Sequence, residues 1–204
     1  MACTGQLKLD VVTIEDSPAL MDLWFAAFSD PKSRQLFPDT PGMRKWLQHA
    51  IHNDLLGGPL QRYLKVIDPE LKDANDRPRI AAYAKLDSLT PEERGPRYPQ
   101  WHDDMPKQIC EEFVNRGDNN RKRVMGNRRH IFLDMVATHP DYRRQGAASM
   151  LVQRGCDIAD AEGVEMYVSA SKDGASLYAK FGFVDYSILG QETVSMVRHV
   201  RCVD

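Results

Sequence analysis

The sequence predicts an α+β domain in which helices flank a mixed, mostly antiparallel sheet. Three observations support this prediction. Short apolar runs with strand character alternate along the chain with segments of helical periodicity. Two pairs of these runs are separated by turn-like segments, as in antiparallel hairpins. An apolar run over residues 131–137 leads through a tight turn into an amphipathic helix. The 204 residues suit a single domain with a core of its own.

Composition excludes several classes of protein. The formal net charge of −2 disfavours broad binding to nucleic acid or to a membrane surface. No apolar run is long enough to span a bilayer. Residues 1–6 lack signal-peptide character. The cysteines have no metal-ligand spacing, so we expect no metal site and a reducing, cytoplasmic setting; they are Cys3, Cys110, Cys156 and Cys202.

The first part of the chain predicts a strand followed by two helices. Apolar and polar residues alternate loosely over residues 7–14, which are predicted to form the first strand. Pro18 and the acidic residues before it mark a helix start. The residues that form the apolar face of that helix are Ala19, Leu20, Leu23, Trp24, Ala27 and Phe28. Three prolines between residues 31 and 41 predict a loop, and a second helix is expected over residues 43–56.

A hairpin and a long connection come next. Residues 62–67 and 80–86 read as paired strands around a charged turn. Residues 87–129 then form an insertion, in which a helix is expected from Pro106 to about Arg116. Long connections in compact domains are often functional, so we interpret the insertion as a substrate-side lid. The alternative is a solvated surface insertion, because basic runs such as residues 121–123 usually face water.

The central feature is the strand, turn and helix that follow this insertion. The strand ends at His139-Pro140-Asp141, because proline cannot donate to a sheet ladder. Gly146 opens a helix, and its apolar stripe comprises Met150, Leu151, Cys156, Ile158 and Ala159. The first amides of such a helix have no intrahelical partner and favour negative charge. Gly146 lets a phosphate approach the backbone, and Arg143 and Arg144 add cationic donors.

This turn predicts a diphosphate site, although an ordinary strand-turn-helix unit with two solvated arginines would look similar. After the helix, residues 165–170 read as another strand. A short helix containing Tyr178 follows, and Gly182 suits the left-handed residue after its end. Residues 183–189 and 193–200 complete the chain as a hairpin.

Two of these segments resemble the GNAT acyltransferase superfamily of acetyl-CoA-dependent N-acetyltransferases. Arg143, Gly146 and Ala148 match its cofactor pattern of Gln or Arg, two residues, Gly, one residue, and Gly or Ala. Residues 177–183 match its "L-Y-x-x-x-G-F" segment. The resemblance implies a GNAT-like sheet in which the insertion precedes the cofactor-binding strand. It also implies acetyl-CoA as co-substrate and no metal.

The resemblance carries a set of cofactor contacts onto this sequence. The strand would meet the pantetheine arm, the loop would hold the diphosphate, and the short helix would reach the thioester. Ser171 stands where many relatives carry Asn. The implied cofactor-binding residues are Met135, Val136, Ala137, Thr138, Arg143, Arg144, Gln145, Gly146, Ala147, Ala148, Ser149, Ser171, Ala175 and Tyr178.

Two residues are candidates for catalysis. Tyr178 occupies the family's tyrosine position, where a phenol can donate to the leaving sulfur; the alternative is a core tyrosine packed beside Phe181 and Phe183. Asp134 interrupts an apolar strand and shares a face with Phe132. Several GNAT relatives present a Glu or His to the acceptor amine from this face, so the resemblance implies that Asp134 is the candidate base. The alternatives are a structural carboxylate or one that binds the substrate ammonium.

The resemblance thus implies transfer of an acetyl group to a primary amine, and we expect the amine to belong to a small molecule. Direct attack in a ternary complex is favoured, because no cysteine falls on a site position. The alternatives are acetylation of a protein or peptide terminus or lysine, and an acyl-CoA sensor without turnover. We expect a monomer or homodimer with a small-molecule partner, without nucleic acid or membrane.

Overall fold

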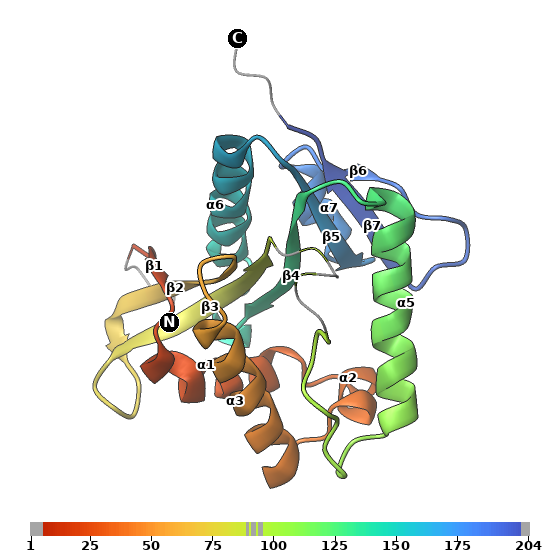
Figure 1. Ribbon diagram of the computed structural model, residues 1–204. Coiled ribbons are helices and arrows are strands. Elements are labelled where there is room, and N and C mark those ends of the chain that lie inside the picture. The colour runs from red at the N-terminus through yellow and green to blue at the C-terminus, as the bar shows by residue number, and fades with distance from the viewer. Residues whose placement is uncertain (1–5, 89, 91–92, 94–95, 201–204) are drawn as a thin grey trace.

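A computed structural model describes residues 6–88, 90, 93 and 96–200. Its seven strands form one sheet in the order β1-β2-β3-β4-β5-β7-β6 (Figure 1). The strands are β1 (Lys8–Val11), β2 (Gln61–Lys72), β3 (Pro78–Asp87), β4 (His130–Thr138), β5 (Glu165–Ser171), β6 (Val184–Asp185) and β7 (Thr193–Arg198). The helices are α1 (Ser17–Ala27), α2 (Pro31–Leu36), α3 (Pro41–Leu56), α5 (Lys107–Met125), α6 (Ala147–Glu162) and α7 (Ala175–Ala179). The mixed, mostly antiparallel sheet flanked by helices is therefore confirmed.

The sheet opens in its middle. β4 and β5 are parallel, and every other neighbouring pair is antiparallel. The parallel pairing joins His130–Leu133 to Glu165–Val168 and goes no further. Beyond it, β4 continues beside β3 and β5 continues beside β7. The two central strands therefore separate after Leu133, and the edge of β4 over residues 134–138 has no β5 neighbour.

A β-bulge lies at the point where the strands separate. Lys85 of β3 pairs with Met135, but the next residue, Leu86, pairs with Leu133. Asp134 is thus the extra residue on β4. A bulge changes the direction of the side chains around it and increases the local twist. The odd charge in the apolar strand therefore coincides with its one break in register against β3.

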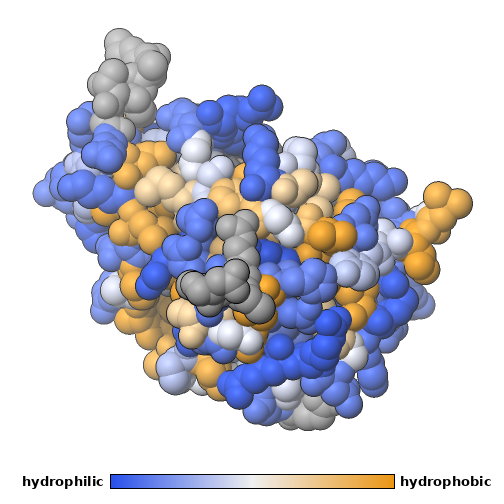
Figure 2. Space-filling view, turned by 90° about the horizontal axis from the view of Figure 1, so that it is seen from above, coloured by the Kyte–Doolittle hydropathy of each residue, from blue (hydrophilic) through white to orange (hydrophobic). Residues whose placement is uncertain are grey.

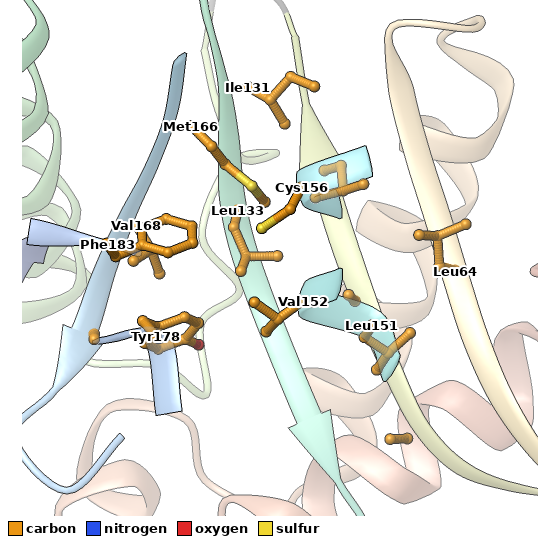
Figure 3. Packing of buried hydrophobic residues seen from close by; sticks show 14 of the residues in the cluster. Leu64, Ile131, Leu133, Leu151, Val152, Cys156, Met166, Val168, Tyr178 and Phe183 are labelled. Atoms are coloured by element: carbon orange, nitrogen blue, oxygen red, sulfur yellow. The ribbon is translucent and has the colours of Figure 1, made fainter. Parts of the chain in front are cut away.

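The sheet is covered on both faces. α6 packs against β2, β3 and β4 over the larger apolar cluster, where Leu151, Val152 and Cys156 lie against Leu133 and Met166 (Figure 3). On the other face, α1 and α3 pack against the β2–β4 region and α5 against β5 and β7. Seen from above, the surface carries apolar side chains in separate areas between polar ones (Figure 2).

Three elements differ from the sequence prediction. α5 continues to Met125 rather than ending near Arg116. Arg121 explains this, because its side chain is buried and donates from Nε to Nε2 of His130 over 2.7 Å. The expected loop over residues 31–41 contains α2, which Asp30 caps by accepting from the Lys32 and Ser33 amides. The final hairpin is shorter than expected, since β6 spans only Val184–Asp185.

Candidate functional site

The turn after β4 is held in place by side chains of β2 and β3. Pro140–Tyr142 form a 3-10 turn, and the Tyr142 side chain is buried. Its hydroxyl donates to Oδ2 of Asp68 on β2 over 3.0 Å. Arg79 of β3 donates to Asp141 over 2.8 Å. The turn is therefore held to β2 and β3 before the chain reaches the loop at residues 143–146.

The start of α6 fits a phosphate group. Arg144 and Gly146 have φ values of 65° and 88°, in the left-handed region. Such turns direct successive backbone amides toward one point. No side chain caps the helix, and a Cβ added to Gly146 would meet nothing within 4 Å. The first amides of a sixteen-residue helix thus face open space, where an anion is stabilised by the helix dipole.

Other loop residues that were predicted to contact the cofactor form hydrogen bonds with nearby parts of the chain. Nη2 of Arg143 donates to the carbonyl oxygen of Ala27 over 2.8 Å, which joins the loop to the end of α1. Gln145 donates from Nε2 to the Asp141 carbonyl over 2.6 Å. Ala147 is buried beneath the helix start, whereas Arg144 is exposed. The remaining members of the predicted loop, Ala148 and Ser149, lie in the first turn of α6.

The strand contacts lie along the opening of the sheet. The part of β4 beyond its pairing with β5 contains Met135, Val136, Ala137 and Thr138. Their side chains alternate between the two clusters: Val136 packs with the α6 cluster and Ala137 with the α1 and α3 cluster. A linear ligand entering this gap would therefore lie along β4 with apolar side chains on either side.

The end of β5 positions the short helix α7. The Ser171 hydroxyl accepts a 3.1 Å hydrogen bond from the Gly174 amide just before Ala175. Tyr178 is buried in the α6 cluster, and its ring lies 5.7 Å from that of Phe183 in an edge-on arrangement. Figure 3 shows it in the same layer of side chains as Val152 and Phe183. Burial raises the pKa of the Tyr178 hydroxyl to about 12, so the phenol stays protonated at neutral pH.

Asp134 lies on the opposite face of the sheet and is paired with two cations. Its side chain is 1% exposed. Arg97 of the insertion donates to Oδ1, and Nζ of Lys85 lies 3.2 Å from Oδ2. Positive charges at such distances favour the ionised carboxylate, whereas burial opposes it. A buried charge persists when it is paired, so we interpret Asp134 as an ionised group.

Lys85 extends this pairing to α3. Its Nζ lies 2.5 Å from Oδ2 of Asp54, which also accepts a 2.8 Å hydrogen bond from the Tyr63 hydroxyl. Burial, followed by the charge of Asp54, raises the pKa of Tyr63 well above its ordinary value. Tyr63 therefore remains a hydrogen-bond donor, and Asp54, Lys85 and Asp134 form a continuous polar chain inside an apolar region.

A small cavity adjoins this chain of charges. Its volume is about 30 Å³, room for one or two water molecules. Aromatic and apolar side chains form most of its wall, and the lining residues are Trp24, Leu47, Ala50, Ile51, Asp54, Tyr63, Tyr83, Lys85, Tyr98, Asp134 and Met135. Within the described part of the chain, no cluster of histidine, cysteine and acidic residues could hold a metal ion.

The gap in the sheet links the two candidate catalytic residues. Tyr178 belongs to the α6 face, and Asp134 points into the cavity under α1 and α3. The strands separate after Leu133, immediately before Asp134. A group held in the gap beside β4 is therefore accessible from both faces, with the phenol on one side and the carboxylate on the other.

Sequence reasoning missed the partners of Asp134. Lys85 had a usable signal, because it is a lone charge in the apolar strand of residues 80–86. Asp54 had one too, since it follows Ala50 and Ile51 on the apolar face of its helix. Arg97 had no signal, because it lies in an irregular part of the insertion and reaches Asp134 only through the folded chain.

The family comparison agrees with this geometry. Residues 86–183 match the model described as the acetyltransferase (GNAT) family. The matched segment contains β4, the loop before α6, and Tyr178. The matched segment is therefore similar to acetyltransferases of the GNAT family, whose members use acetyl-CoA as the acetyl donor. Among the curated proteins, none matches this sequence.

Solved structures with the same fold include several N-acetyltransferases. Arylalkylamine N-acetyltransferase 2 from Aedes aegypti is 12% identical with a TM-score of 0.64, covering 96% of this chain and 100% of that one. The PaiA N-acetyltransferase from Thermoplasma acidophilum, in complex with coenzyme A, is 12% identical with a TM-score of 0.57 over 95% and 99%. The ribosomal-protein-S18-alanine N-acetyltransferase from Escherichia coli is 13% identical with a TM-score of 0.53 over 94% and 91%. At these identities the similarity concerns the fold.

No helix in the described part of the chain combines the length and the apolar character needed to cross a membrane.

Proposed function

We propose that this protein is an acetyl-CoA-dependent N-acetyltransferase that acetylates a primary amine of a small molecule by direct attack in a ternary complex. The observation that carries the proposal is the position of the Asp134 carboxylate. It lies at the bulge where β4 and β5 separate and lines a cavity with four aromatic side chains. An aromatic cavity with a carboxylate suits an organic ammonium ion, through its charge and through cation–π contact.

The residues around the opening fit the cofactor. Acetyl-CoA, when bound, supplies an acetyl group activated as a thioester. The amides at the start of α6 would hold its diphosphate, and the free edge of β4 over residues 135–138 would bind its pantetheine arm. The exposed Arg144 adds charge near the phosphates. Ser171 and Ala175 border the gap from the β5 side.

We assign Tyr178 to the leaving sulfur. Its pKa of about 12 keeps the proton on Oη at neutral pH. A thiol ordinarily titrates near ~8.5, so complete transfer of the phenolic proton to a thiolate would be uphill. Tyr178 therefore acts chiefly by donating a hydrogen bond to negative charge that develops on sulfur, and water completes the protonation. The hydroxyl has no hydrogen-bonding partner among the described residues that would compete with this role.

We assign Asp134 to the acceptor amine. An ammonium ion has no lone pair and must lose a proton before it attacks. A carboxylate paired with Lys85 is a weaker base than an isolated buried one. Its larger contribution is then to bind and orient the ammonium, with proton loss to water or to the same carboxylate. The substrate would enter from the side of α1 and α3.

The small volume of the cavity, about 30 Å³, favours a small acceptor over a protein chain. The Aedes aegypti enzyme is named for arylalkylamines and the Escherichia coli enzyme for a ribosomal protein, so the fold itself accommodates both classes. The buried thiol of Cys110 is free, in keeping with a cytoplasmic setting.

The test is a turnover assay that follows release of free thiol from acetyl-CoA. The panel contains butylamine, phenylethylamine, tyramine, spermidine, lysine and a peptide with a free amino terminus. Acetylation of one or more of the small amines, with product verified by mass spectrometry, is the expected result. Acetylation of the peptide alone would favour a protein acetyltransferase. Binding of acetyl-CoA without turnover of any member would favour a sensor.

A further inference from the structure

Arg97 occupies the position where a substrate ammonium would meet Asp134. It is a cation of the insertion, and its guanidinium is paired with this carboxylate. Its guanidinium also contacts Asp118 of α5, with Nη1 3.1 Å from Oδ1. The Asp134 side chain is 1% exposed and the Asp118 side chain is 42% exposed. Arg97 thus bridges a buried carboxylate and a half-exposed one.

The backbone that follows Arg97 is held to two helices. We call residues 96–105 the strap. Trp46 of α3 donates from Nε1 to the Gln100 carbonyl over 2.9 Å and stacks on Trp101 at 5.1 Å. Trp101 in turn donates from Nε1 to Glu111 of α5 over 2.8 Å. The strap therefore joins α3 to α5.

The cavity beside Asp134 is too small for an acceptor in the arrangement that the structure shows. Its volume of about 30 Å³ is well below the several hundred Å³ of typical ligand pockets. Tyr98, the next residue of the strap, forms part of the wall. An acceptor must therefore displace side chains to reach the carboxylate, and the strap holds those nearest to it.

The charges around this carboxylate favour a cationic ligand. Arg121 interacts electrostatically with Asp87, Arg97, Asp118 and Asp134, and Lys85 joins Asp54 to the same group. An ammonium ion that displaced Arg97 would keep a positive charge beside the buried Asp134 carboxylate, which is costly to leave unpaired.

We propose that Arg97 is a specificity-determining residue that competes with the acceptor's ammonium for Asp134. When the acceptor binds, Arg97 turns toward Asp118, and the ammonium takes its place at Asp134. The rings of Phe132 and Tyr98, at 4.9 and 5.2 Å from the guanidinium, line its position. This inference rests on the proposed function, and it adds that a residue of the insertion sets the affinity for the amine.

The mechanism predicts opposite effects for two substitutions. Arg97→Gln removes the competitor, so the KM for the amine falls while kcat changes little. If the carboxylate is open about a tenth of the time, the fall is about tenfold. Asp118→Asn removes the alternative partner and retains Arg97 at Asp134, so the KM for the amine rises several-fold. The KM for acetyl-CoA stays unchanged in both variants.

The experiment measures both KM values with the panel amine that is acetylated fastest. Arg116→Gln is the matched control, because Arg116 is an exposed arginine of α5 that pairs with Glu192 at 3.5 Å. Calorimetric titration of phenylethylamine gives a second readout that does not depend on turnover. Thermal unfolding identifies variants that are not folded; if Arg97→Gln is one, Asp118→Asn at its half-exposed position still tests the proposal.

A KM for the amine that rises in Arg97→Gln, or that moves in the same direction in both variants, would overturn the proposal. Unchanged KM values in both would do so too. Absence of acetylation with every small amine would instead contradict the proposed function. In that case the titration still reports whether Arg97→Gln binds the ammonium more tightly, so the two failures remain distinct.

Discussion

Nζ of Lys85 lies 3.2 Å from Oδ2 of Asp134, across the bulge that makes Asp134 the extra residue of β4. Without that extra residue, strict alternation along β4 would not place both Asp134 and Met135 in the wall of one cavity. The bulge therefore does two things at once. It directs the carboxylate toward Lys85, and it marks the point where β4 and β5 part.

Asp134→Asn tests the role of this carboxylate. The amide keeps the shape but carries no charge to hold an ammonium ion. We expect turnover at neutral pH to fall by roughly a hundredfold, the usual scale for a positioned acid-base group. Part of it should return at high pH, where more of the amine is unprotonated. The pH profile of kcat/KM for the amine is the measurement.

The control for this variant is Asp160→Asn. Asp160 pairs with both terminal nitrogens of Arg198, at 2.7 and 2.6 Å, away from the proposed acceptor cavity. Its replacement should lower stability and leave turnover unchanged. If Asp134→Asn keeps the rates and the pH profile of the parent, Asp134 has only a structural role.

Gly146→Leu tests the phosphate site at the start of α6. The left-handed backbone strains any other residue there, but the surroundings leave space for a side chain. The fold should persist, with a cost of about 1–2 kcal/mol. Binding of acetyl-CoA should be lost, because the side chain would fill the space in front of the helix amides. Calorimetry with acetyl-CoA measures this.

Gly163 offers a matched control at the other end of the same helix. Its φ is 65°, and a Cβ there would also meet nothing within 4 Å. Gly163→Leu should therefore cost similar stability and bind acetyl-CoA normally. Equal affinity of the two variants for acetyl-CoA would show that the cofactor does not bind at this loop.

The sequence predicted the parts of the site that are contiguous in the chain. The strand, turn and helix around Gly146 follow from hydrophobic periodicity and from the conformational demands of glycine and proline. Asp134 stood out because a charge is unfavourable in an apolar strand. These inferences needed only neighbouring residues, and the fold class followed from the order of such segments.

The environment of Asp134 could not be predicted in the same way. Lys85 meets it because β3 and β4 pair in one register up to the bulge and in another beyond it. Asp54 comes from α3 and Arg97 from the strap, so their contacts depend on how separate layers pack. The length of α5 also depended on packing, because buried Arg121 reads in the sequence as part of a solvated basic run.

Tyr178→Phe separates a hydrogen-bond donor from a packing residue. The ring would keep its contact with Phe183, so stability should change little. If the hydroxyl serves the leaving sulfur, turnover should fall by roughly a hundredfold with near-normal affinity for acetyl-CoA. The loss should shrink with an acyl donor whose thiol is more acidic, because that thiolate needs less stabilisation.

Tyr167→Phe is the companion variant. Tyr167 is also buried, and its hydroxyl shares a 3.2 Å hydrogen bond with Ser195. Removing it should lower stability without changing turnover. Equal rates in Tyr178→Phe and the parent, under conditions where chemistry limits turnover, would leave Tyr178 as part of the pocket wall.

The environment of His130 predicts how the stability of the folded protein changes as the pH falls. Its Nε2 accepts from Nε of Arg121 over 2.7 Å, and its Nδ1 lies 2.7 Å from the Arg128 carbonyl. Both contacts are satisfied by a neutral ring with its proton on Nδ1. Burial lowers the pKa of His130 to about 4. Protonation of the folded state would place a second charge against Arg121.

The sign of the effect follows from proton binding. The unfolded chain protonates His130 as the pH falls through ~6.5, whereas the folded protein does so only near pH 4. Between these values the unfolded state binds more protons, so the free energy of unfolding falls as the pH falls. The loss from this residue alone is about 2 kcal/mol at about pH 5. Urea denaturation at a series of pH values measures it.

His130→Gln tests the assignment, since its side-chain oxygen can accept from Arg121 and its amide can donate to the Arg128 carbonyl without titrating. This variant should lose about 2 kcal/mol less than the parent between about pH 7 and pH 5. His52→Gln, on the exposed side of α3, should behave like the parent. If His130→Gln and the parent lose stability in parallel over this range, the acid response arises from other groups.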